Sequence, residues 1–272
     1  MNILLTGSDG NFGQTFRVRA GMDVRSLGRH DWRSLDELFG DAPIVVHAAS
    51  DLSADGLSRP VGWVESNVMS TARLLEKAAK QGVRRFVFLS SCAVYGEAMS
   101  TAEDSICHPI SVNGIGKLLN ERLVADFCQA HGIAYQILRI FNMYGGVDRF
   151  SIVSRLERAV RAGHEFVLRN GGVAQRDFIH VDDVADMVAK LIQLPVRYNR
   201  LNLGTGVATR IVDLVDLAVA RYPQLRIVRD AQTSREAEYS RADTTRLHEM
   251  LDFAPKSVVD HVRDGFPVSM PR

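Results

Sequence analysis

This chain has few cysteines, almost no excess of positive over negative charge, and no long apolar run. Its 272 residues include Cys92, Cys107 and Cys128, an odd number without paired spacing, so we expect neither a disulfide framework nor a metal site. The formal net charge is +1, which suggests neither nucleic acid nor an acidic membrane as a partner. No apolar run approaches the ~20 residues that span a bilayer. The N-terminus opens into a strand rather than a signal peptide, so we expect a cytoplasmic protein.

What the chain does have is an ordinary globular composition, 46% apolar and 24% charged. Its length allows a large buried core, as one large domain or as a main domain with a smaller lobe. Strand-like and helix-like segments alternate along it. This alternation predicts an α/β fold with a doubly wound parallel sheet.

The sequence is organised around its first glycine-rich stretch, residues 3–13. An apolar run ends at Thr6, and glycines follow at 7, 10 and 13, which predicts a buried strand, a tight turn and the start of a helix. The helix N-terminus then offers N–H groups and partial positive charge to phosphates. The spacing is G-x-x-G-x-x-G rather than the G-x-G-x-x-G of dehydrogenases. Glycine-rich turns often only connect a strand to a helix, without binding a ligand. The position of this turn after the first strand favours a dinucleotide site.

The second predicted strand, Asp23 to Leu27, bears on the choice of cofactor. An acidic residue at its end would hold the adenosine ribose of NAD, and neither Leu27 nor Gly28 can do so. Arg29 could instead meet the 2′-phosphate of NADP, and Asp31 could still reach the ribose or adenine. The sequence therefore leans to NADP and leaves NAD open, because a surface arginine after a strand is commonplace.

Later strands end in small or polar residues. Ala48 and Ala49 would let a cofactor lie across a strand end, although helix–sheet packing explains them equally well. Ligands bind at the carboxyl ends of strands in open α/β sheets, so the ends near 5–7, 47–50 and 90–92 should converge on one crevice.

Long helices are predicted from Trp63 to Lys80 and from Asn113 to Gly132. Asn67 lies within the first, where a polar residue is either exposed or bonded to a neighbouring loop. A further helix from Val184 should be capped by Asp182 or Asp183.

Five motifs, in order, make the chain resemble the extended short-chain dehydrogenase/reductase superfamily, in its nucleotide-sugar epimerase/dehydratase/4-ketoreductase branch. The motifs are Thr6–Gly13, Leu89–Gly96, Arg139–Gly145, Arg176–Asp183 and Asn202–Gly206. The resemblance implies a Rossmann-type domain at 1–145, to which segments near 175–200 return, and a mainly substrate-binding lobe at 146–272. It also implies NAD or NADP, a UDP-, dTDP- or GDP-hexose substrate, and a homodimer formed through helices near 64–80 and 113–131.

The same resemblance assigns chemistry. In that family a Tyr-x-x-x-Lys pair and a Ser or Thr act together: the Tyr is acid/base, and the Lys holds the nicotinamide ribose and lowers the pKa of the Tyr. Ser91 takes the hydroxyl role and Lys117 the lysine role. The tyrosine position is Asn113, and the serine before the lysine is Gly116. An amide does not titrate usefully, and losing a general acid/base costs ~10²–10⁴ in rate.

Candidate replacements for the tyrosine are Tyr95, Tyr144, Cys92, His108, and a substrate hydroxyl or water held by Ser91 and Asn113. The 4,6-dehydratases of the family follow their Thr with Asp-Glu, whereas this chain has Cys92 and Ala93, so we do not expect that reaction. The alternative to an enzyme is a cofactor- or nucleotide-sugar-binding pseudoenzyme with a regulatory or scaffolding role. A non-sugar ketone reductase is a third possibility.

On the substrate side, Asn142 and Arg176 match residues that meet the nucleotide sugar, and Arg235 is a second candidate for the diphosphate. For Arg176 a salt bridge to Asp177 or Asp183 is the plainer alternative. The cofactor contacts that we expect are Gly7, Gly10, Asn11, Phe12, Gly13, Arg29, Asp31, Ala48, Ala49, Asn67, Ser90, Lys117 and Phe141.

Overall fold

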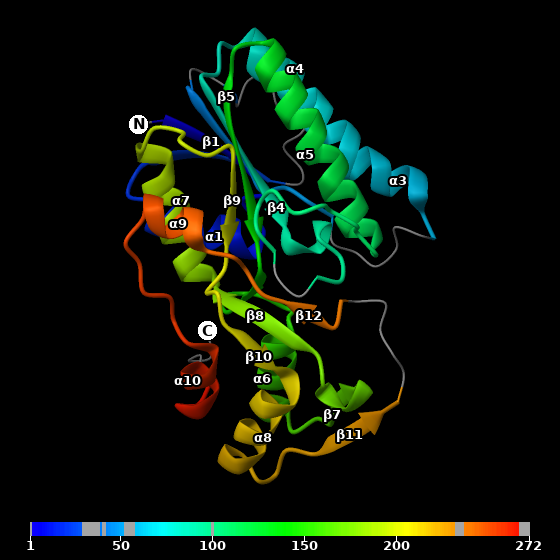
Figure 1. Ribbon diagram of the computed structural model, residues 1–272. Coiled ribbons are helices and arrows are strands. Elements are labelled where there is room, and N and C mark those ends of the chain that lie inside the picture. Colours follow the sequence, from blue (N-terminus) through cyan, green and yellow to red (C-terminus); the bar gives the residue numbers. More distant parts are fainter. Residues whose placement is uncertain are drawn as a thin grey trace.

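The computed structural model describes residues 2–28, 39, 42–51, 58–98, 101–231 and 237–266. The upper part in Figure 1 is a six-stranded sheet in the order β2-β1-β3-β4-β5-β9, in which all neighbouring strands are parallel. The predicted doubly wound parallel sheet is confirmed. Its strands are β1 (Asn2–Thr6), β2 (Asp23–Leu27), β3 (Ile44–His47), β4 (Arg85–Ser91), β5 (Ala134–Ile140) and β9 (Arg200–Leu203).

Helices cover both faces of this sheet, which explains why its strands are apolar on both sides. In β1, Ile3 and Leu5 face one core while Leu4 faces the other. One face is covered by α1 (Asn11–Arg19), α7 (Val181–Gln193) and α9 (Thr245–Met250), and the other by α4 (Ser70–Lys80) and α5 (Val112–Ala130).

The chain changes direction across the sheet after β2. Because β2 lies on one side of β1 and β3 on the other, the carboxyl ends of β1 and β3 border a topological switch point. Ligand crevices of open α/β sheets form at such points. The glycine turn after β1 therefore lies where a ligand is expected.

The helix predicted from Trp63 is one helical run of three parts. It begins with α3 (Pro60–Val64), passes through a π-helical turn η3 (Glu65–Met69) and continues as α4. Single π-helical turns often mark functional positions because they re-aim a side chain. Here the turn carries Asn67.

A second layer lies below the main sheet in Figure 1 and has its own apolar core. Its small sheet runs β10-β8-β12, with β6 also paired to β8, and β7 pairs with β11. The elements are β6 (Asn142–Tyr144), α6 (Ile152–Ala162), β7 (Phe166–Arg169), η5 (Asn170–Gly172), β8 (Gln175–His180), β10 (Ala208–Arg210), α8 (Ile211–Arg221), β11 (Ile227–Asp230), β12 (Tyr239–Ser240) and α10 (Val258–Arg263).

The chain returns to the first layer twice, through α7 with β9 and through α9. The domain boundary at 145 stays a prediction.

The predicted start of α7 is wrong. The helix begins at Val181, directly after β8, and its cap is His180, whose Nδ1 accepts from the Asp182 N–H at 3.1 Å. Asp182 and Asp183 lie in the first turn instead, where carboxylates favour the positive end of the helix.

Candidate active site

Two of the three turn glycines are required by close backbone approach. Gly7 has φ +74°, and a Cβ there would lie 2.7 Å from the Ala49 nitrogen. A Cβ on Gly13 would lie 2.3 Å from the Gly7 oxygen. At Gly10 the nearest atom would be 3.2 Å away, so a pyrophosphate contact there stays a prediction. Helix α1 begins after Gly10 without a side-chain cap, so its first N–H groups fit the phosphates of a dinucleotide.

The side chains of the first helical turn are used within the protein. Asn11 donates to the Gly145 oxygen at 3.0 Å and accepts from the Val147 N–H at 2.8 Å. Phe12 is buried and stacks on Phe16. Cofactor contacts of Asn11 and Phe12 stay predictions, with their backbone N–H groups as the available donors.

A chain of hydrogen bonds joins the ends of β1 and β3 to the π-helical turn. The Ala49 N–H donates to Thr6 Oγ1 at 3.2 Å, and Thr6 Oγ1 lies 2.7 Å from His47 Nδ1. His47 Nε2 lies 2.9 Å from Thr71 Oγ1, which donates to the Asn67 oxygen. Burial lowers the pKa of His47 to about 3, so the ring is neutral, and the donors along the chain place its proton on Nε2.

Asn67 forms hydrogen bonds to the loop after β3. Its Oδ1 accepts from Ser50 Oγ at 3.0 Å and from the Asp51 N–H at 2.8 Å, while its Nδ2 lies 3.2 Å from the Trp63 oxygen. Of the two alternatives predicted for Asn67, exposure or a bond to a neighbouring loop, the structure shows the bond to a loop. Its contact with the cofactor stays a prediction, as do those of Ala48 and Ala49, which border the same strand end.

Ser91 ends β4 and caps the short turn η4 (Cys92–Val94), where its Oγ accepts from the Ala93 N–H at 3.2 Å. Helix α5 starts against this turn, since a Cβ on Gly114 would lie 2.4 Å from the Ala93 oxygen. Asn113 and Lys117 are one helical turn apart and share a face of α5. The fold thus carries the predicted catalytic set on two elements in direct contact.

Lys117 is buried beneath that face. Its Nζ donates to the Leu89 oxygen at 2.8 Å and lies 4.9 Å from the centre of the Phe88 ring. Burial lowers its pKa to about 8, and the charge of Glu121 partly opposes the shift. An ammonium has three donors, so Lys117 can still hold a ribose.

The residues behind Lys117 form a buried polar network. Ser90 Oγ donates to Glu121 Oε1 at 2.5 Å, and Arg139 Nη2 lies 2.7 Å from Glu121 Oε2. Arg139 also stacks on Tyr95, whose hydroxyl donates to Asn202 Oδ1 at 2.7 Å. The Ser90 hydroxyl is therefore engaged with Glu121, and its contact with the cofactor stays a prediction.

Three of the candidate replacements for the tyrosine, Tyr95, Tyr144 and Cys92, are poorly suited to proton transfer. Burial raises the pKa of both Tyr95 and Tyr144 above the ordinary value. Burial also raises the pKa of the Cys92 thiol to about 12, although the charge of Arg176 partly opposes the shift. The structure fixes the backbone of His108, whose N–H donates to the Tyr95 oxygen at 3.3 Å.

Among the predicted substrate contacts, Asn142 donates from Nδ2 to the Asp177 oxygen at 2.8 Å and lies 3.0 Å from Ser240 Oγ. Phe141 is buried against Tyr95. Arg176 is also buried, close enough to Cys92 to influence its thiol. These roles stay predictions.

Arg29, Asp31 and Arg235 lie outside the described residues. The carboxylate of Asp177, one of the plainer partners for Arg176, accepts from three backbone N–H groups and from Thr205 Oγ1.

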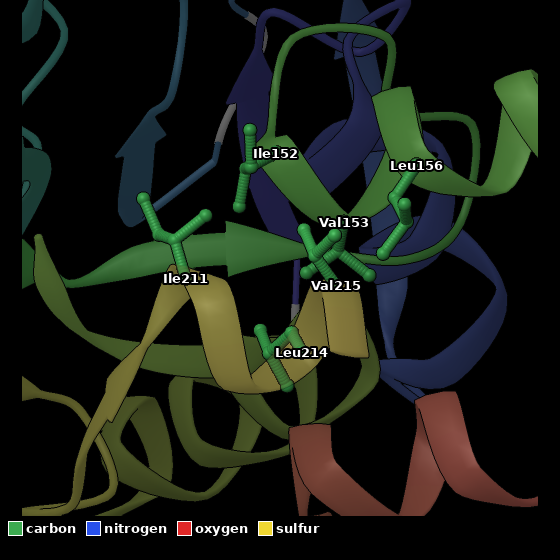
Figure 2. Close-up of a pocket in the computed structure, with 6 residues that line it drawn as sticks. All are labelled: Ile152, Val153, Leu156, Ile211, Leu214 and Val215. Carbon is green, nitrogen blue, oxygen red and sulfur yellow. The ribbon is translucent and has the colours of Figure 1, made fainter. Parts of the chain in front are cut away.

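One hollow of the second layer has no polar side chain in its lining. Figure 2 shows this hollow between α6 and α8, where all the lining side chains are aliphatic. Within the described ranges, no three His, Cys, Asp or Glu side chains gather to hold a metal ion, and no helix has the length and apolar character to cross a membrane.

The topological switch point, the glycine turn and the buried lysine are together typical of α/β dinucleotide-binding proteins. More specifically, the chain belongs to the NAD dependent epimerase/dehydratase family, whose match covers residues 5–204. The resemblance at the family level is therefore confirmed.

Curated relatives include a putative UDP-glucose 4-epimerase of Methanocaldococcus jannaschii, 30% identical over 68% of this chain and 63% of the relative. A UDP-glucose 4-epimerase of Rhizobium leguminosarum bv. trifolii is 29% identical over 71% of this chain and 65% of the relative. The chain thus spans just under two thirds of these relatives. UDP-glucuronic acid decarboxylase 5 of Arabidopsis thaliana is 26% identical over 77% of the chain and 63% of that protein.

Solved structures agree on the fold. MoeE5 in complex with UDP-glucuronic acid and NAD has a TM-score of 0.89 at 26% identity, covering 97% of each chain. The UDP-glucose 4-epimerase of Thermotoga maritima has a TM-score of 0.85 at 28% identity, covering 97% of this chain and 96% of the other. An NAD-dependent NDP-hexosamine 5,6-dehydratase, TunA, has a TM-score of 0.85 at 25% identity, covering 96% of this chain and 95% of the other. We do not expect 4,6-dehydration because of Cys92 and Ala93. Since decarboxylases and a dehydratase are among the similar proteins, this exclusion stays a prediction.

Proposed function

We propose that this protein is an NAD-dependent nucleotide-sugar epimerase or 4-ketoreductase acting on a UDP-, dTDP- or GDP-hexose. The observation that carries the proposal is the retention of Ser91 and Lys117 on two elements in contact, at the same edge of the parallel sheet as a glycine turn that fits a dinucleotide. UDP-sugar and NAD complexes among the structural neighbours support the substrate class and the cofactor.

In this proposal the chain positions the sugar and supplies charge. Lys117, with its pKa near 8, keeps a positive charge at neutral pH and holds the ribose beside the developing alkoxide. Ser91 donates to the sugar oxygen, and Asn113 holds the same oxygen or a water that carries the proton. When bound, NAD would accept a hydride from the sugar and return it in epimerisation, whereas NADH would donate the hydride in ketoreduction. Asn142, Arg176 and Arg235 hold the nucleotide and diphosphate.

The test is turnover on a panel of hexose and 4-keto nucleotide sugars with NAD or NADH, followed by product analysis. We expect the natural protein to turn over at least one, and Lys117→Met to abolish this. No turnover on a broad panel on which a reference epimerase works would contradict an enzyme.

The amide at position 113 favours an alternative, a binding pseudoenzyme with a regulatory or scaffolding role. The substitution Asn113→Tyr distinguishes this alternative from an enzyme. In a working atypical site the bulky ring displaces the proton-carrying water, so we expect kcat to fall by about tenfold to a hundredfold. Asn199→Tyr, at an exposed asparagine, is the matched control. Activity that appears only in Asn113→Tyr would establish the pseudoenzyme.

We also propose a homodimer built on the outer faces of α3–α4 and α5. These faces expose apolar side chains at helical spacing, among them Val61, Val64, Ile115 and Leu119. The helices lie side by side at the right of Figure 1, so the exposed residues can form one surface.

A further inference from the structure

We infer that Asp9, within the glycine turn, supplies the carboxylate that binds the adenosine ribose and thereby selects NAD over NADP. The inference rests on the proposed dinucleotide site and names a determinant of its specificity. It starts from β2, which ends in Leu27 and Gly28 and so presents no acidic side chain at the position where dinucleotide folds usually carry one.

The backbone of the turn fixes where Asp9 lies. The Gly10 N–H donates to the Gly7 oxygen at 3.0 Å, which closes a tight turn with Ser8 and Asp9 at its corner. The Gly7 N–H donates to the Leu27 oxygen at 2.9 Å and ties this corner to the end of β2. From α1, Gln14 Nε2 donates to the Asp9 oxygen at 2.7 Å.

The side chain of Asp9 occupies the space that a side chain at position 28 would take. A Cβ on Gly28 would lie 2.4 Å from Asp9 Oδ2 and 3.0 Å from its Cγ. Only glycine at 28 leaves this room. The carboxylate of Asp9, on the neighbouring turn, therefore lies where an acidic side chain at the end of β2 would lie.

Charge gives this placement its consequence. A carboxylate accepts hydrogen bonds from ribose hydroxyls and repels the 2′-phosphate of NADP. Asp9 is exposed, so salt screens the repulsion, and discrimination against NADP should weaken as ionic strength rises. A carboxylate at this point opposes the preference for NADP that Arg29 suggests from the sequence.

The experiment measures dissociation constants for NAD and NADP by calorimetry on nucleotide-free protein. We expect the natural protein to prefer NAD by at least about tenfold, and Asp9→Asn to bring the two constants to near equality by strengthening NADP. Asp23→Asn removes the same charge from an exposed carboxylate at the opposite end of β2 and should leave the ratio unchanged.

A relocation variant separates charge from structure. Asp9→Ala combined with Gly28→Asp moves the carboxylate from the turn to the strand and should restore the preference for NAD that Asp9→Ala alone loses. Arg29→Ala tests the competing hypothesis: an NADP preference in the natural protein that Arg29→Ala removes would overturn the role of Asp9. Binding of both coenzymes with a ratio unaltered by Asp9→Asn would overturn it as well. If neither coenzyme binds the folded protein, both the proposed dinucleotide site and the role of Asp9 are wrong.

Discussion

At the scale of single residues, the amide at position 113 is part of a wider change in α5. Gly116, one turn further along the same face, packs under an indole: a Cβ there would lie 2.1 Å from Cη2 of Trp63. The backbone oxygen of Trp63 in turn accepts from Asn67. The two departures from the family pattern, Asn113 and Gly116, therefore belong to one region of α5, where Trp63 fills the space beside the catalytic face.

Restoring the family serine at position 116 tests that packing. Gly116→Ser forces its Cβ into the Trp63 ring, and overpacking of this kind costs about 1–3 kcal/mol of unfolding free energy. Urea unfolding measures the loss, and the double variant Gly116→Ser/Trp63→Leu should recover part of it. Gly62→Ser is the matched control, because a Cβ at Gly62 meets nothing within 4 Å. Equal stability of the two serine variants would show that the indole moves aside without cost.

His47 should make the protein sensitive to acid. Burial lowers its folded pKa to about 3, whereas the unfolded chain binds a proton near the ordinary value. The unfolded state thus holds more protons below about pH 6.5, so stability falls as pH falls, by about 1 kcal/mol from pH 6 to pH 5.

Comparing variants isolates this contribution. His47→Gln removes the titrating ring, so its unfolding free energy should fall less steeply than that of the natural protein over the same pH interval. His131→Gln, at an exposed histidine, should keep the natural slope. Parallel slopes in all three proteins would place the acid sensitivity on other groups.

At the scale of elements, local patterns predicted what is determined locally. The bounds of β2 agree with prediction, and the glycine turn takes its predicted form because short-range sterics dictate it. Ser91 and Lys117 lie at a strand end and on a helix face, and their catalytic roles, which the family resemblance implies, stay predictions.

Features that depend on how elements join or pair in the folded chain were not predicted. His180 caps α7 only because β8 runs into the helix without a loop, and the polar roles of Asn67 depend on a π-helical turn that no sequence period indicates. The position of Asp9 against Gly28 likewise needs β1 and β2 to be paired in register before it can be seen.

The junction between α7 and the sheet depends on one buried arginine. Arg85 Nη1 donates to the Ile192 and Leu194 oxygens at 2.9 and 2.7 Å, and Nη2 donates to Gln136 Oε1. Arg85→Met leaves these acceptors buried without partners, so we expect a loss of about 2–4 kcal/mol in denaturant unfolding. Arg84→Met, at the exposed neighbour, is the control. A loss no larger than that of the control would mean that water replaces the guanidinium.

At the scale of the whole molecule, the site and the proposed dimer surface share one helix. Asn113 and Lys117 lie on the face of α5 that packs inward, while Ile115 and Leu119 are more than half exposed on the other, at 55% and 52%. Association through Ile115 and Leu119 would hold α5 rigid from outside, so the oligomeric state bears on the order of the active site.

The double variant Ile115→Glu/Leu119→Glu tests this association. Burying carboxylates in an apolar interface is costly, so the dissociation constant of the dimer should rise by at least about a hundredfold, and light scattering at micromolar concentrations should give a monomer's mass. Val18→Glu, at an apolar residue of α1 that is 85% exposed, is the control and should stay dimeric. A natural protein that is monomeric under these conditions, or a double variant that stays dimeric, would show that α5 forms no interface between copies. A monomeric variant that keeps its affinity for NAD but loses kcat would tie assembly to the order of the Asn113–Lys117 face.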